Sequence, residues 1–146
     1  VMFISRLVES PRDIVVYGRA IGHKYVEVRD DATAVDIKKL DWKESWPHYI
    51  RVTEPEFVAG TLRNGVSLYS LMEELGPESF ASTMRNRSRG EGNTNPRRAY
   101  LQQAAVELTP KGAEWLNDRL EAAFQTHEKI PQSKIDNLDR PEVELS

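Results

Sequence analysis

Strand-like and helix-like segments follow one another in mixed order along this chain, and that order limits the folds it can adopt. A doubly wound protein needs strands and helices in strict alternation, and this sequence lacks it. The 146 residues suit one domain, long enough to bury a core without disulfides or a structural metal. The order predicts an α+β domain with a small twisted or barrel-like sheet and flanking helices.

The N-terminal residues predict a β-hairpin. Residues 1–8 and 14–21 are rich in strand-forming side chains, and the Ser-Pro-Arg-Asp sequence between them is a turn signal. Gly18 lies inside the second strand, where a glycine often marks a bulge or a close backbone approach. Further along, Tyr49 to Thr53 predicts another strand, which Pro55 is expected to end.

Helix signals dominate the second half of the chain. One helix is predicted after Ser67, whose side chain can cap it, with apolar residues at helical spacing as far as Gly76. The Thr109-Pro110 pair predicts the start of a longer helix, with an apolar stripe at four-residue spacing. That stripe consists of Leu116, Leu120 and Phe124. Residues 104–108 fit a helix or a strand equally well.

Residues 81–95 show no apolar period and predict a polar loop, followed by a helix start at Asn95-Pro96. Residues 85–98 contain five arginines and one glutamate, a net charge of +4 on a chain whose total is −3. Guanidinium groups suit phosphate, so this segment is a candidate phosphate contact. The alternative is a solvated loop whose arginines pair with acidic groups elsewhere in the domain. The arginines are Arg85, Arg87, Arg89, Arg97 and Arg98.

Aromatic residues gather in a second segment. Trp42, Trp46, His48 and Tyr49 lie close together in sequence, and Tyr17 of the hairpin is expected nearby. Aromatic rings can sandwich a planar nucleic-acid base while a polar group reads its edge. The alternative is that the tryptophans are core residues.

Composition excludes several classes of chemistry. The absence of cysteine removes disulfide scaffolds, thiolate metal sites and cysteine nucleophiles. The three histidines lack the usual metal-ligand spacing, and no phosphate-binding loop or nucleophile elbow is present. A catalytic pair such as His48 with Asp41 stays open as an alternative. With neither a transmembrane run nor a signal-peptide pattern, we expect a cytoplasmic protein that does not bind membranes.

Several motifs occur together in a recognisable order. They are VVYGRAIGHKY, the Trp-rich loop, YIRVTEPEFV, VSLYSLMEELG, the arginine segment and LTPKGAEWLNDRLEAAF. In this order the chain resembles the PUA-like superfamily over about residues 1–125, and most closely the EVE-type domains that bind modified bases. The resemblance implies a partly open barrel whose mouth takes a base. It also implies that Tyr17, Trp42, Trp46, His48 and Tyr49 form the pocket while the arginines contact phosphates.

The expected protein is therefore a single domain over residues 1–128 with a polar tail or linker over residues 129–146. Its expected function is to bind DNA or RNA and to read a base, either modified or unmodified, without catalysis and without a cofactor. The resemblance adds a nuclease or translocase module as a possible fused or separate partner. The alternatives are a protein-interaction module and a small nuclease or hydrolase that uses His48 or His23.

Overall fold

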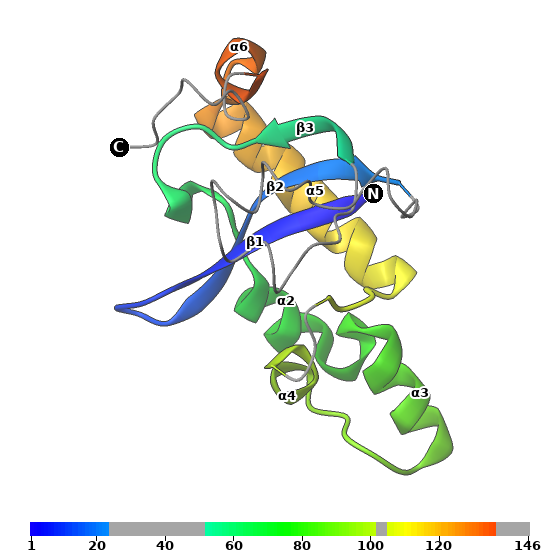
Figure 1. The fold of residues 1–146 in the computed structure, drawn as a ribbon. Coiled ribbons are helices and arrows are strands. Elements are labelled where there is room, and N and C mark those ends of the chain that lie inside the picture. The colour runs from blue at the N-terminus through cyan, green and yellow to red at the C-terminus, as the bar shows by residue number, and fades with distance from the viewer. Residues whose placement is uncertain (24–51, 102–104, 137–146) are drawn as a thin grey trace, which may run out of the picture.

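The computed structural model describes residues 1–23, 52–101 and 105–136, and these form an α+β domain with an open antiparallel sheet (Figure 1). This confirms the predicted class. The strands are β1 (Met2–Val8), β2 (Asp13–Gly22), β3 (Val52–Phe57) and β4 (Val66–Ser67). The helices are η2 (Leu62–Asn64), α2 (Leu68–Leu75), η3 (Gly76–Ser79), α3 (Ala81–Arg89), α4 (Pro96–Leu101), α5 (Pro110–His127) and α6 (Gln132–Asp136).

Strand β2 is the centre of the sheet. It pairs with β1 as the predicted hairpin, and its other edge pairs with β4 near its start and with β3 near its end. The β1–β2 register shifts between Ile4 and Ser5, whose partners are Gly18 and Val16, so Tyr17 is an extra residue on β2. The bulge predicted near Gly18 is thus confirmed. A Cβ added at Gly18 would lie only 2.4 Å from Cδ1 of Phe57, so this contact requires glycine.

Strand β3 passes through Pro55, and the prediction that this proline ends a strand is wrong. The register with β2 is interrupted here: Glu56 pairs with Arg19, whereas Thr53 pairs with Ile21. Pro55 and Glu54, which has a φ of 52°, lie within the irregularity. Because Pro55 has no N–H to donate, its place at an irregularity breaks no ladder hydrogen bond.

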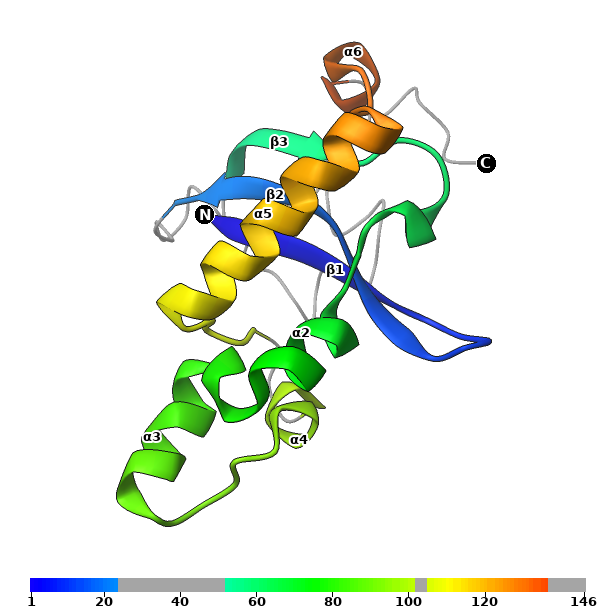
Figure 2. The same ribbon diagram turned by 180° about the vertical axis from the view of Figure 1, so that it is seen from behind.

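Helix α5 covers one face of the sheet (Figure 2). The predicted stripe of Leu116, Leu120 and Phe124 is buried there, as the spacing required. Helix α2 adds Leu71 and Met72 to the same core. This core of described residues joins β2, α2 and α5, and it leaves α3 at one end of the molecule (Figures 1 and 2).

The predicted helix starts are confirmed by their caps. The Ser67 hydroxyl accepts a hydrogen bond from the Ser70 N–H (3.1 Å), and the Thr109 hydroxyl accepts one from the Gly112 N–H (2.9 Å). The side-chain oxygen of Asn95 accepts one from the Arg97 N–H (3.0 Å). These three side chains therefore set where α2, α5 and α4 begin.

The polar loop predicted over residues 81–95 is largely a helix, so that prediction is wrong. Helix α3 occupies Ala81–Arg89 and ends at Gly90, which has a φ of 68°. Tertiary contacts stabilise this helix in place of an apolar stripe. Phe80 is buried just before it, and the buried Thr83 hydroxyl donates to the carbonyl oxygens of Pro77 (2.6 Å) and Phe80 (2.9 Å).

The segment that follows α5 stays attached to the sheet. The Ala59 N–H donates to the Glu128 carbonyl (3.0 Å), and the Ile130 N–H donates to the Phe57 carbonyl (2.9 Å). Helix α6 then forms within the stretch that was expected to be a tail. The predicted tail over residues 129–146 stays a prediction for residues 137–146, which lie outside the described residues.

Candidate functional site

Helix α3 carries three arginines that are all exposed to solvent: Arg85, Arg87 and Arg89. Its last turn is free of the body of the protein, since residues 87–90 are exposed in succession. The beginning of the helix is attached to the body of the protein, because the Ala81 N–H donates to the Glu107 carbonyl (3.0 Å). The arginines thus lie on the projecting half of a helix that is anchored at its other end.

Helix α4 lies beside α3 and contributes the other two arginines. Arg97 is already engaged: its guanidinium lies 4.1 Å from the centroid of the Tyr69 ring and 3.6 Å from the Glu73 carboxylate. Arg98 is exposed. Within residues 1–23, 52–101 and 105–136, no ion pair joins a carboxylate to any of four arginines, which we call the arginine surface: Arg85, Arg87, Arg89 and Arg98.

The loop between α3 and α4 is tied down by asparagines. The Asn86 side chain donates to the Asn93 carbonyl (2.7 Å), and the Asn86 carbonyl accepts from the Glu91 N–H (3.1 Å). The Asn93 side chain accepts in turn from the Asn95 N–H (2.9 Å). These bonds join the end of α3 to the start of α4, so a turn held by hydrogen bonds connects the two helices that carry the arginines.

The predicted aromatic pocket lies mostly outside the described residues, because Trp42, Trp46, His48 and Tyr49 fall between residues 24 and 51. Tyr17 is half-buried on β2. Its ring stacks on Phe57, with the centroids 5.7 Å apart and the planes at 23°. Phe57 therefore supports one face of the Tyr17 ring.

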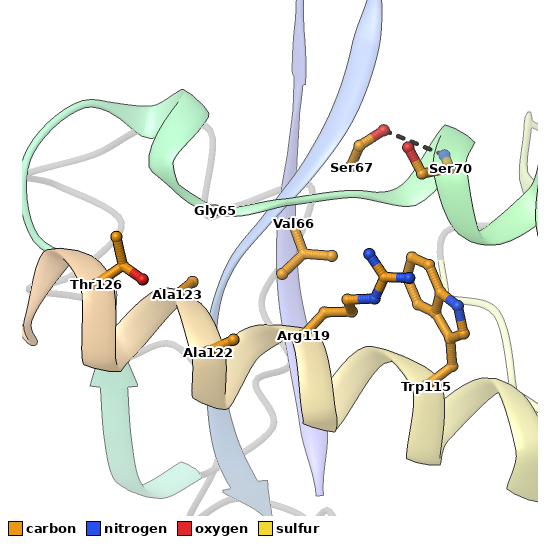
Figure 3. A pocket seen from close by; sticks show the side chains of 9 residues that line it. All are labelled: Gly65, Val66, Ser67, Ser70, Trp115, Arg119, Ala122, Ala123 and Thr126. Atoms are coloured by element: carbon orange, nitrogen blue, oxygen red, sulfur yellow. Dashed lines mark hydrogen bonds between the residues drawn. The ribbon is translucent and has the colours of Figure 1, made fainter.

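A pocket that the sequence did not indicate lies between α5 and the segment from Gly65 to Ser70 (Figure 3). It has a volume of about 300 Å³, and its walls include the small side chains of Ala122 and Ala123. At one end, Trp115 Nε1 donates to the Glu74 carboxylate (2.7 Å). Arg119 stacks on the Trp115 ring at 4.6 Å and lies 3.4 Å from the same carboxylate. Because Glu74 compensates the charge of Arg119, this pocket offers no uncompensated cation to an anionic ligand.

Among the described residues, neither His23 nor His127 forms a catalytic pair with an acid. His23 Nε2 lies 2.8 Å from the Thr53 hydroxyl at the exposed surface, and His127 is exposed at the end of α5. His48 and Asp41 lie outside the described residues. No group of three or more potential metal-ligating side chains occurs in the described part of the chain. Nor, in that same part, is any helix both long and apolar enough to cross a membrane.

The comparisons with known proteins give no match: no family model fits the sequence, and no curated protein or solved structure is found to be similar. The site is therefore defined by its own geometry. It is a surface of four exposed arginines on two adjoining helices, none of which has a carboxylate partner among the described residues.

Proposed function

We propose that this protein binds nucleic acid and that the arginine surface contacts the phosphate backbone. The observation that carries the proposal is that four exposed arginines gather on two adjoining helices, with no carboxylate partner for any of them among the described residues. Each guanidinium presents a fixed fork of N–H donors that matches phosphate oxygens. Such contacts bind any sequence and position the protein on the strand.

Other arginines of the chain show what an internal structural role looks like. Arg19, Arg97 and Arg119 each lie within 4 Å of a carboxylate, and Arg63 donates to the carbonyl oxygens of Glu9 and Pro11 (2.7 Å each), so these arginines join elements of the fold to one another. The arginine surface lacks such partners in the described structure. This contrast favours a contact with an external polyanion over an internal structural role.

We further propose that the sheet belongs to a partly open, PUA-like barrel that reads a base with Tyr17, Trp42, Trp46, His48 and Tyr49. The open antiparallel sheet and the order of the sequence motifs support this proposal. Replacing Trp46 by alanine should reduce the preference for a modified base over its unmodified form. Stacking of a base on an aromatic ring contributes about 1–3 kcal/mol. An equal loss of affinity for the modified and the unmodified base would contradict a role of Trp46 in telling the two apart.

The phosphate contacts are tested by the triple substitution R85A/R87A/R89A. Affinity for short DNA and RNA oligonucleotides is measured by fluorescence anisotropy at several salt concentrations. Each lost phosphate contact should flatten the slope of log K against log[salt] by about 0.9 on a B-form duplex, so the triple variant should lose nearly three.

The matched control is R6A/R12A/K134A. It removes the same charge from three exposed cations on the hairpin and on α6. The control should keep the wild-type slope within about one unit, because its cations are distant from the proposed contact. Equal slopes in the wild type and the R85A/R87A/R89A variant would overturn the assignment. The absence of low-salt binding to any oligonucleotide would overturn the proposed function and favour a protein-interaction module.

A further inference from the structure

The three arginines of α3 lie on opposite flanks of the helix. Successive residues of an α-helix are rotated by about 100°, so Arg87 and Arg89 lie about 100° to either side of Ser88. Arg85 lies about 60° from Ser88, on the same flank as Arg89. Cations therefore border both sides of an exposed face whose central side chain on the last turn is the small Ser88.

The arrangement of arginines on both flanks of α3 is complementary to the major groove of B-form DNA. The major groove of B-form DNA is about 12 Å wide and lies between two rows of phosphates, and a helix with its side chains is about 10–12 Å across. A helix inserted there meets phosphates on both flanks and base edges in the middle. Cations on the flanks and a small hydroxyl side chain between them are complementary to that environment.

The position of α3 in the fold permits the approach. The helix lies at one end of the molecule, and its last turn projects from the body (Figures 1 and 2). The one acidic residue of the segment, Glu91, comes after the helix has ended at Gly90. The first turn is anchored to the body, and the Asn86 hydrogen bonds join the end of the helix to the loop before α4, so little order has to be gained on binding.

We propose that α3 inserts its last turn into the major groove of double-stranded DNA, with Ser88 toward the base edges, Arg87 toward one phosphate strand and Arg85 and Arg89 toward the other. This inference rests on the proposed nucleic-acid binding and narrows its partner to duplex DNA. An A-form RNA duplex has a deep, narrow major groove that excludes side chains, so it distinguishes insertion from simple charge attraction.

The experiment compares a DNA duplex, an RNA duplex of the same sequence and the single DNA strand, all by fluorescence anisotropy at one salt concentration. The DNA duplex should bind at least about tenfold more tightly than the RNA duplex, because only its groove admits the helix. Guanine N7 atoms, which face the major groove, should be protected from methylation by dimethyl sulfate when the protein is bound.

Two substitutions at Ser88 test the orientation. S88E puts a carboxylate at the centre of the inserted face, and S88L puts uncharged bulk there. Both should weaken binding to the DNA duplex by about tenfold or more while changing binding to the single strand much less. The matched control S133E adds the same charge at an exposed serine of α6 and should change both affinities by less than about twofold.

The outcomes separate this inference from the function it rests on. Equal affinity for the DNA and RNA duplexes, or unprotected guanine N7 atoms, would overturn groove insertion and leave phosphate binding standing. An equal loss of affinity for the DNA duplex and the single strand in S88E would also overturn insertion, because charge repulsion alone would explain it. Failure of the wild type to bind any of the three would overturn the proposed function itself.

Discussion

At the scale of the residue, Arg19 connects the sheet to the helix that covers it. Its side chain is 14% exposed and donates to Glu56 on β3 (3.1 Å) and to Asn117 on α5 (2.5 Å). It also pairs with Glu121, and its guanidinium lies 5.2 Å from the centroid of the Phe124 ring. One side chain thus satisfies polar groups from two elements in a mostly buried setting.

Replacing Arg19 by methionine should therefore destabilise the fold. We expect a loss of about 2 kcal/mol in the free energy of unfolding, because the substitution leaves carboxylates and an amide without their donor. Arg119 is the matched control: its side chain is 56% exposed, and R119M should cost less than about 1 kcal/mol. Urea unfolding of both variants measures the difference. Equal losses would contradict a special role for the buried cation.

Glu56 should make stability depend on pH in the acid range. The hydrogen bond from Lys129 and then that from Arg19 lower the pKa of the Glu56 carboxyl below its usual range, against the effect of burial. Since the pKa is lower in the folded than in the unfolded chain, the carboxylate stabilises the fold at neutral pH. This contribution is lost as the pH falls through the folded-state pKa. The stability difference between the wild type and E56Q should therefore shrink between about pH 7 and about pH 3. A constant difference in urea unfolding would contradict this.

At the scale of the element, the start of α5 depends on one threonine. The Thr109 hydroxyl accepts from the Gly112 N–H and donates to the Glu78 carbonyl (2.5 Å), so it both caps α5 and ties it to η3. T109A should lower the free energy of unfolding by about 1–2 kcal/mol, and T109S should recover most of that loss because it keeps the hydroxyl. Thermal unfolding followed by circular dichroism measures both variants. If T109S is as unstable as T109A, the methyl group and not the cap matters.

The elements that the sequence predicted correctly are those that depend on near neighbours in the chain. The hairpin, the caps at Ser67 and Thr109 and the stripe on α5 each follow from residues a few positions apart. Helix α3 was missed because its stability comes from the buried Thr83 and Phe80 and from contacts with residues much later in the chain. Strand β3 continues through Pro55 because of its register with β2, which no local pattern reveals.

The same distinction applies to the candidate site. The sequence indicated the arginines as a group, because a charge excess can be counted without a fold. It did not indicate that three of them lie on a helix with Ser88 between two flanks, because that helix was not predicted. The pairing of Arg97 with Tyr69 and Glu73 also required the packing of α4 against α2. Tertiary structure therefore reduces the five candidate arginines to four that are free of carboxylate partners in the described structure.

At the scale of the whole molecule, charge is distributed unevenly. Residues 85–98 carry +4 and the rest of the chain carries −7, so this segment attracts a polyanion while the net charge of the remainder opposes binding. The number of phosphate contacts should consequently be small. With the four arginines of the arginine surface in contact with phosphates, the slope of log K against log[salt] on a DNA duplex should be about −3 to −4.

Titrations of the wild type at a series of salt concentrations measure that slope directly. A protein that used cations from its whole surface would give a much steeper dependence, because each further neutralised phosphate adds nearly one unit. A slope steeper than about −6 would show that cations beyond the arginine surface take part, and one near zero would show that the complex is not held by phosphate contacts. Between these limits, the slope measures how many arginines contact phosphates. It should be consistent with the nearly three units lost in R85A/R87A/R89A, because Arg98 is the residue of the arginine surface that this variant keeps.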